Sequence, residues 1–80
     1  MVTVRFFAAA RAAAGGASAE GAEAGSIREL VQVLTDRHGE RLGLVLKSAS
    51  FLVDGLACHD REAHLPAEVT VNVLPPFAGG

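Results

Sequence analysis

One stretch decides the fold, and it reads Val69-Thr70-Val71-Asn72-Val73-Leu74-Pro75-Pro76-Phe77-Ala78-Gly79-Gly80. Its valines alternate with other side chains, which is the period of a β-strand with one buried face. Because proline has no N–H to donate to a neighbouring strand, the strand is predicted to end at Pro75. Two consecutive prolines also favour an extended backbone, which stiffens the exit from the folded domain.

The last residues, Ala78-Gly79-Gly80, have one methyl side chain followed by two residues without a side chain. Glycine lets a backbone pass where any side chain would clash, so this end suits a narrow active site in another protein. The reactive group would then be the Gly80 carboxylate, which is ionised at neutral pH and needs activation by a partner. The alternative is a frayed terminus without a role, as chain ends often are. We predict a folded domain over residues 1–76 and a flexible diglycine tail over residues 77–80.

Length and composition restrict the class of protein. Eighty residues make one domain with a small core. A net charge of −2 with seven Lys and Arg gives no basic surface typical of nucleic-acid binding. No apolar run approaches the roughly 20 residues of a membrane span, and the first residues lack the features of a signal peptide. A single cysteine excludes an internal disulfide and fits a reducing compartment, so we expect a cytoplasmic protein.

The first 25 residues are predicted to contain a strand and a short helical turn. Residues 2–8 alternate so that Val2, Val4 and Phe6 share the core face. Residues 9–14 are rich in alanine and end at Gly15-Gly16, which favours a helical turn. Residues 17–25 carry no firm period and could form either a weak edge strand or a loop.

The clearest helix begins after Ser26. Ser26 and Glu29 have the spacing of a capping box, and an apolar stripe follows at Ile27, Leu30, Val31 and Leu34. Gly39 is suited to end this helix. His38 lies in the last turn, where a cation interacts favourably with the helix dipole, so we interpret it as a capping residue and not as a proton-transfer group.

The remaining residues predict a short crossing segment and a hairpin. Residues 41–47 hold Leu42, Leu44, Val45 and Leu46 and are interpreted as a short buried crossing segment. Asp54-Gly55 is a strong turn signal between a strand over residues 51–53 and a returning strand over residues 56–59. The polar residues 60–67 then lead to the final strand, which begins near Glu68.

This order of elements predicts an α+β protein, with a mixed sheet curled over one main helix. If the first and last strands are parallel neighbours, the helix is their right-handed crossover. That arrangement is the β-grasp, or ubiquitin-like, fold.

The sequence lacks the parts of a self-sufficient active site. Cys58, His59 and His64 resemble a metal site only loosely, because structural zinc needs four ligands and neighbours on a strand point to opposite faces. We therefore expect no metal. No base or helix N-terminus near Cys58 would activate its thiol, and Gly15-Gly16 lacks the pattern of a phosphate-binding loop.

The tail carries a family resemblance. Leu74-Pro75-Pro76-Phe77-Ala78-Gly79-Gly80 resembles the closing motif of the MoaD family, the small sulfur-carrier subunits of molybdopterin synthase. Residues 4–8, with Arg11 and Gly15, are similar to that family's opening strand and first turn. Residues 26–30 resemble the start of its main helix, and residues 53–55 resemble its hairpin. The resemblance covers essentially the whole chain.

The resemblance implies a mechanism that relies on partner proteins. An adenylating (E1-like) enzyme would use ATP and Mg²⁺ to activate the Gly80 carboxylate, and a sulfur donor protein would convert it to a thiocarboxylate. The tail, with Gly79 giving access, would then enter the large catalytic subunit of molybdopterin synthase and give its sulfur to cyclic pyranopterin monophosphate. The chain would hold no permanent cofactor and would not be an enzyme on its own.

The same resemblance implies a partner-contact surface at the root of the tail, formed by Phe7, Leu74, Pro75, Pro76, Phe77 and Ala78, with Arg5 and Arg11 as further docking residues. Three alternatives remain open. They are a sulfur carrier for thiamine or tRNA thiolation, a ubiquitin-like protein modifier joined to lysines through Gly80, and an interaction module with an inert tail. The Leu-Pro-Pro-Phe-Ala approach to the diglycine favours the molybdopterin pathway.

Overall fold

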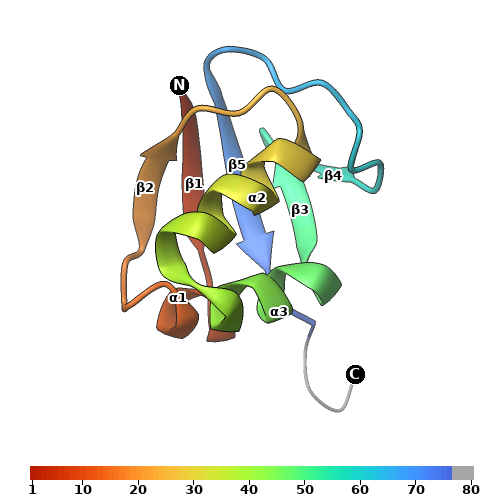
Figure 1. Ribbon diagram of the computed structural model, residues 1–80. Coiled ribbons are helices and arrows are strands. Elements are labelled where there is room, and N and C mark those ends of the chain that lie inside the picture. Colours follow the sequence, from red (N-terminus) through yellow and green to blue (C-terminus); the bar gives the residue numbers. More distant parts are fainter. Residues whose placement is uncertain (77–80) are drawn as a thin grey trace.

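The computed structural model describes residues 1–76 (Figure 1), and the predicted tail, residues 77–80, lies outside the described residues. Along the chain the elements are β1 (Val2–Phe6), α1 (Ala9–Ala13), β2 (Ala19–Ala22), α2 (Ile27–His38), α3 (Glu40–Ser48), β3 (Ser50–Val53), β4 (Leu56–Cys58) and β5 (Val69–Leu74). The strands form one five-stranded sheet in the order β2-β1-β5-β3-β4.

The last strand occupies the centre of this sheet. β5 runs parallel to β1, with Val71 opposite Val4, and antiparallel to β3 on its other side. β2 and β4 are antiparallel to their neighbours and form the two edges. α2 crosses one face of the sheet (Figure 1) and lies between β1 and β5 in the chain. The predicted β-grasp arrangement is therefore confirmed.

The core follows the alternation seen in the sequence. Burial in β1 and β5 alternates residue by residue, and the buried side chains are Val2, Val4, Phe6, Val69, Val71 and Val73. The stripe of α2 covers them with Ile27, Leu30 and Leu34. Because a slip of one residue would turn every buried valine to solvent, this pattern fixes the register of the two central strands.

The main helix begins and ends where the sequence predicts. The Ser26 side chain accepts a hydrogen bond from the Glu29 N–H at 3.1 Å, and the Glu29 carboxylate accepts one from the Gly25 N–H at 2.7 Å. At the other end Gly39 has a φ of +99°, a conformation that glycine adopts readily, and its N–H donates to the Thr35 carbonyl at 2.7 Å.

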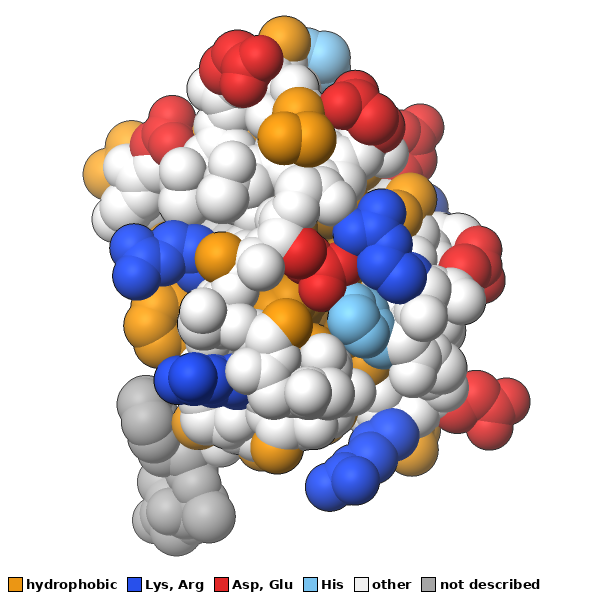
Figure 2. Space-filling view, turned by 90° about the vertical axis from the view of Figure 1, so that its left-hand side faces the viewer, with side chains coloured by type: hydrophobic (Ala, Val, Ile, Leu, Met, Phe, Trp, Pro, Cys, Tyr) orange, Lys and Arg blue, Asp and Glu red, His pale blue; other side chains and the backbone are white. Residues whose placement is uncertain are grey.

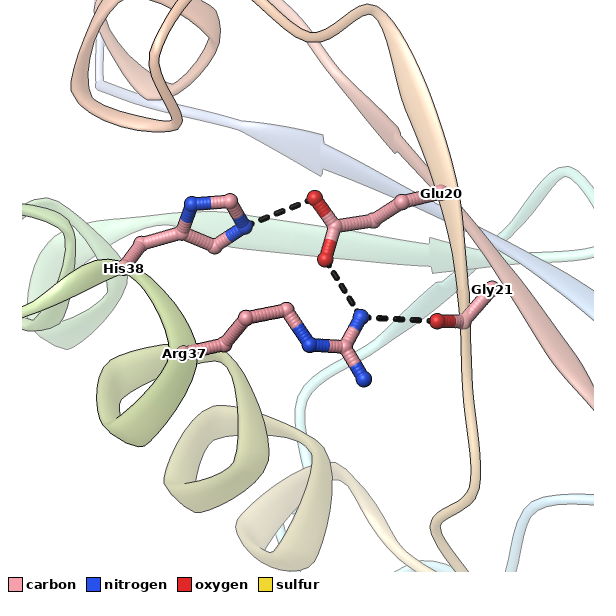
Figure 3. Close-up of polar contacts among 4 residues, drawn as sticks. All are labelled: Glu20, Gly21, Arg37 and His38. Atoms are coloured by element: carbon pink, nitrogen blue, oxygen red, sulfur yellow. Dashed lines mark hydrogen bonds and ion pairs between the residues drawn. The ribbon is translucent and has the colours of Figure 1, made fainter.

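His38 lies in the last turn of α2, as the sequence predicts, and its side chain also contacts β2. Its Nε2 lies 2.7 Å from Oε1 of Glu20 on β2, and its ring meets Phe6 edge-on at a centroid distance of 6.0 Å. Arg37 donates to the other oxygen of Glu20 at 2.6 Å and to the Gly21 carbonyl at 2.8 Å (Figure 3). The end of α2 is thus bound to β2 by these polar contacts.

Residues 17–25, which the sequence left between a strand and a loop, contain the edge strand β2. Glu20 lies opposite Val4, so it points to the helix-covered side of the sheet. A carboxylate at such a position needs partners, and Arg37 and His38 supply them. At this position of β2 an alternating strand pattern would have an apolar side chain, and the chain has Glu20, which forms ion pairs, in its place.

The interpretation of residues 41–47 as a short crossing segment is also wrong, because these residues belong to the nine-residue helix α3. Only one side of α3 is buried, at Leu42 and Leu46, and Leu44 is 65% exposed. A Cβ on Gly43 would lie 3.0 Å from the Thr35 methyl carbon, so glycine allows α3 to approach α2 closely. α3 and α1 lie side by side at one end of the sheet (Figure 1).

The predicted hairpin is confirmed and is tied to the central strand. Asp54 and Gly55 both have positive φ, +48° and +85°. The Asp54 N–H donates to the Thr70 carbonyl at 2.8 Å, and Oδ1 of Asp54 accepts from the Thr70 N–H at 2.9 Å.

None of the helices in residues 1–76 has the length and apolar character that crossing a membrane needs.

Candidate functional site at the end of the central strand

The fold brings the root of the tail to one end of the sheet. Since β1 and β5 are parallel, both strands finish at this end, where α1 and α3 also lie (Figure 1). The Phe7 N–H donates to the Val73 carbonyl at 3.3 Å, which extends the pairing one step beyond β1. The chain therefore leaves from the middle of the sheet. We call this region, formed by Arg5 to Ala13, α3 and Leu74 to Pro76, the tail end.

The two prolines divide the fold from the tail. Leu74 is half-buried, Pro75 is buried and Pro76 is exposed. The prolines line a shallow groove of about 310 Å³ together with Ala9, Leu44, Val45 and Ser48. Both prolines were expected at the partner-contact surface, and this stays a prediction; Pro75 is buried at the end of the strand, while Pro76 is the proline that is exposed. The predicted end of the strand at Pro75 is confirmed.

Phe7 lies beside this exit, in a strained turn. The register that pairs Phe6 with Val73 makes Leu74 the next neighbour of Phe7. Phe7 is 37% exposed, and the Arg5 guanidinium carbon lies 5.8 Å from the centre of its ring, within the range of a cation–π contact. The next residue, Ala8, has φ +52° and ψ −125°, which L-residues rarely adopt. β1 consequently ends at Phe6 and not at Ala8.

Two features of this end were not found from the sequence. Leu44 projects from α3 beside the tail groove, and helical spacing of Leu42, Val45 and Leu46 could have shown that it lies off the buried stripe. Asn72 lies between Arg5 and Leu52 across the sheet, and within residues 1–76 its buried Oδ1 has no hydrogen-bond partner. The sequence signal for this feature was Asn72 itself, a polar residue between two valines of the strand.

The described part of the site contains no reacting group. The residues expected to react or to give access, Gly79 and Gly80, lie outside the described residues, as do Phe77 and Ala78. Cys58 is half-buried, and its thiol donates to the Asp60 carbonyl at 3.5 Å. In residues 1–76 no three His, Cys, Asp or Glu side chains gather in a way that could hold a metal ion. What the structure describes is the root of the tail and the surface around it.

Comparison with known families settles the relationship. The model of the ThiS family matches residues 4–80, almost the entire chain. The chain belongs to the ThiS family. As a ThiS-family member it is one of the ubiquitin-like sulfur carriers, which confirms the relationship indicated by the tail motif. Among curated proteins none matches the chain.

Several solved structures share the fold of this ThiS-family chain. It is similar to a molybdopterin-converting factor subunit 1 of Pyrococcus furiosus, with a TM-score of 0.81, 24% identity and coverage of 95% of this chain and 97% of that one. It is also similar to a complex of subunits 1 and 2 of molybdopterin-converting factor from Helicobacter pylori, with a TM-score of 0.73, 23% identity and coverage of 99% of this chain and 97% of that one. For the small archaeal modifier protein 1 of Methanosarcina acetivorans the TM-score is 0.83 and the identity 22%, and the match covers 99% of this chain and 95% of that one.

Proposed function

We propose that this chain is the sulfur-carrier subunit of a molybdopterin synthase. The observation that carries the proposal is the exit of the chain from the centre of the sheet, between the buried Pro75 and the exposed Pro76. The family match through Gly80 supports sulfur-carrier chemistry at the diglycine. Likeness to molybdopterin-converting factor subunits from two organisms is consistent with this pathway, and the Leu-Pro-Pro-Phe-Ala approach to the diglycine favours it.

The proposed chemistry takes place at the Gly80 carboxylate. One carboxylate oxygen attacks the α-phosphorus of ATP on the adenylating enzyme, and pyrophosphate leaves. Sulfur at the oxidation level of sulfide, delivered by a donor protein, then attacks the acyl carbon and AMP leaves, so that a thiocarboxylate remains. This sulfur is the nucleophile toward cyclic pyranopterin monophosphate in the large subunit, and water afterwards releases the Gly80 carboxylate. Two such rounds supply the two sulfurs of the dithiolene.

In this scheme the carrier positions the carboxylate, and its partners supply the catalytic groups. Gly79 and Gly80 carry no side chain that would block a narrow channel. The buried Pro75 keeps the start of the arm fixed to the domain, and the exposed Pro76 directs it outward. Phe7 and Leu74 beside the exit offer apolar contacts for the rim of the partner's channel.

The first test is a reconstituted sulfur transfer to the carrier. The purified chain is incubated with the adenylating enzyme from the same organism, ATP, Mg²⁺ and sulfide, and its intact mass is then measured and localised by fragmentation. We expect one oxygen to be replaced by sulfur at Gly80. Oxidation of Met1 or Cys58 gives nearly the same mass change, so fragments that end at Gly80 decide the result. An unmodified Gly80 carboxylate after complete reaction conditions would contradict the proposal.

The second test asks which pathway receives the sulfur. Thiocarboxylated carrier is mixed with the large synthase subunit and cyclic pyranopterin monophosphate, and the pterin product is analysed for two added sulfurs. A variant that lacks Gly80 is the matched control and is expected to give no product. Sulfur transfer to a thiazole precursor or to tRNA would assign the chain to another carrier pathway. Covalent adducts between Gly80 and lysines of other proteins would identify a protein modifier instead.

A further inference from the structure

A second groove, which we call the helix groove, lies between α2 and α3. Its volume is about 490 Å³, and its lining includes Val31 and Thr35 of α2 and Glu40, Gly43, Leu44 and Lys47 of α3. Of the described residues, only Leu44 also lines the groove at the two prolines. The helix groove is therefore a surface separate from the root of the tail.

The wall that α3 contributes is a single stripe of that helix. Glu40, Leu44 and Lys47 are spaced four and three residues apart, so their side chains lie along one face. The face is opposite to the buried pair Leu42 and Leu46. A lone exposed leucine is common on protein surfaces. This one, 65% exposed, stands between an acidic and a basic side chain, and in the part of the chain that the structure describes neither forms an ion pair.

The stripe is complementary to itself when two copies of α3 lie antiparallel. A two-fold axis between Gly43 and Leu44 sets Glu40 of each copy opposite Lys47 of the other. The same axis sets Leu44 opposite Gly43 of the other copy, where no side chain fills the groove. A parallel arrangement would instead set like charges against each other, which is unfavourable. The sequence of α3 thus selects the antiparallel arrangement.

We propose that the helix groove is a self-association surface and that its occupant is α3 of a second copy of this chain. Leu44 of each copy enters the groove of the other, where it meets Val31 and Thr35 of α2. Ion pairs between Glu40 and Lys47 flank this apolar centre on both sides. Charges at the rim of an interface fix direction and partner more than they add affinity. The proposal goes beyond the proposed function and does not involve the tail.

Charge favours a second copy over a different partner. A partner surface with one sign of charge would match only one end of the stripe, whereas a second copy matches both ends. Other surfaces lack this arrangement. On the side of β2, apolar side chains are scattered among acidic and basic ones (Figure 2). Glu20 on that strand is already paired with Arg37 and His38.

The length of the contact predicts how strong the pairing is. α3 has nine residues and is therefore about 13 Å long. Two such stripes bury less than the roughly 800 Å² per partner of a stable interface. The charge of −2 on each copy also opposes association slightly. We expect a weak dimer, which forms near about 1 mM chain and dissociates at about 10 µM.

The first test measures self-association of the full chain by sedimentation equilibrium, in a reducing buffer that prevents a disulfide through Cys58. We expect the mean mass to rise from monomer toward dimer between about 10 µM and about 1 mM. Leu44→Gln keeps a good helix former at an exposed position and should raise the dissociation constant about tenfold or more. Leu56→Gln, at a residue that is 75% exposed on β4, is the matched control and should leave it unchanged.

The second test exchanges charges within the stripe. Glu40→Lys leaves two positive charges and Lys47→Glu two negative ones, so each variant alone should stay monomeric. An equimolar mixture should associate, because every contact then joins opposite charges. In a half-labelled sample of the unaltered chain, a nuclear Overhauser effect between Leu44 methyls of one copy and Val31 methyls of the other should locate the contact. This measurement decides the question even where a variant fails to fold.

Several results would overturn the proposal. One is a chain that stays monomeric up to about 1 mM. Another is association that Leu56→Gln abolishes and Leu44→Gln leaves intact, which would assign it to the sheet edge at β4. Association of either charge variant alone, or a mixture that stays monomeric, would contradict the two-fold arrangement. A groove that responds only to a helix of another protein would belong to that protein. None of these results depends on adenylation or sulfur transfer, so failure here is distinct from failure of the proposed function.

Discussion

At the end of the sheet opposite the tail, which we call the far end (Met1, residues 23–29, the turn at Asp54-Gly55 and residues 60–68), polar groups from distant segments satisfy one another, whereas the tail end leaves cations and apolar side chains uncovered. The Met1 ammonium donates to the Ala67 carbonyl at 2.6 Å, and the Leu65 N–H donates to the Gly25 carbonyl at 2.8 Å. At the tail end Leu44 is exposed and Ala8 is strained. We therefore expect contacts at the far end to stabilise the domain, whereas the uncovered side chains of the tail end contribute less to stability. Substitutions at the two ends should therefore have different effects.

The largest effect is expected in the tail itself, from Gly79→Val. A branched side chain next to the reacting carboxylate would displace it in a narrow channel, and a misplacement of about 1 Å costs on the order of 100-fold in rate. We expect thiocarboxylate formation to slow by about that factor and the melting temperature to stay unchanged. Single-turnover mass spectrometry measures the rate. A variant that reacts at the wild-type rate would show that access does not depend on Gly79.

At the far end, Asp54→Ala is expected to destabilise the fold. The turn relies on Oδ1 of Asp54, which accepts from the Thr70 N–H, and the φ of +48° at Asp54 disfavours alanine. Loss of one such acceptor, with the backbone strain, should lower the free energy of unfolding by about 2 kcal/mol. Urea denaturation measures this. Asp54→Asn keeps an acceptor and tolerates positive φ, so it should lose less, and adenylation of the folded fraction should be normal for both.

At the tail end, in contrast to the far end, the substitution Ala8→Gly should stabilise the protein. Ala8 has φ +52° and ψ −125°, where glycine avoids the steric cost of a Cβ. We expect a gain of about 1 kcal/mol in the free energy of unfolding. Ala12→Gly, at an exposed position inside α1, is the matched control and should lose about 0.5–1 kcal/mol. Equal losses in both would mean that Ala8 is not strained.

The smallest effect is expected for Arg28→Gln, which removes the ion pair with Glu62 at the far end. Both side chains are more than half exposed, and such pairs contribute only about 0.2–1 kcal/mol. A double-mutant cycle with Glu62→Gln isolates the coupling energy. A coupling above about 2 kcal/mol would exceed the range of surface pairs and would assign Arg28 a larger structural role.

Most of the fold could be predicted because its central elements follow one-dimensional patterns. The alternation of valines in β5, the capping residues around Ser26 and the Asp54-Gly55 turn all act through near neighbours in the sequence. The sequence pattern did not predict α3 as a helix because α3 has no side-chain cap, directly follows Gly39 and contains Gly43. Leu42 and Leu46 are spaced one helical turn apart, but four apolar residues in so short a run also suit a buried crossing segment.

The candidate site could be predicted only in part, because burial at the tail end depends on packing between distant elements. Phe7 and Leu74 come together because β1 and β5 are parallel neighbours; the fold prediction contained this pairing but not its register. The burial of Pro75 requires α1 and α3 at the same end, and the sequence did not show that placement. Glu20 finds Arg37 and His38 only in three dimensions. The roles of Phe77, Ala78, Gly79 and Gly80 stay predictions.

The central position of β5 has a mechanical consequence. A partner that draws the tail into a channel pulls on the end of a strand that is hydrogen-bonded along both sides, to β1 and to β3. Force along the strand loads all of these bonds together in shear, while an edge strand pulled sideways would lose them one after another. We therefore expect the domain to resist unfolding by a pull on the end of β5 better than it would if β5 were an edge strand.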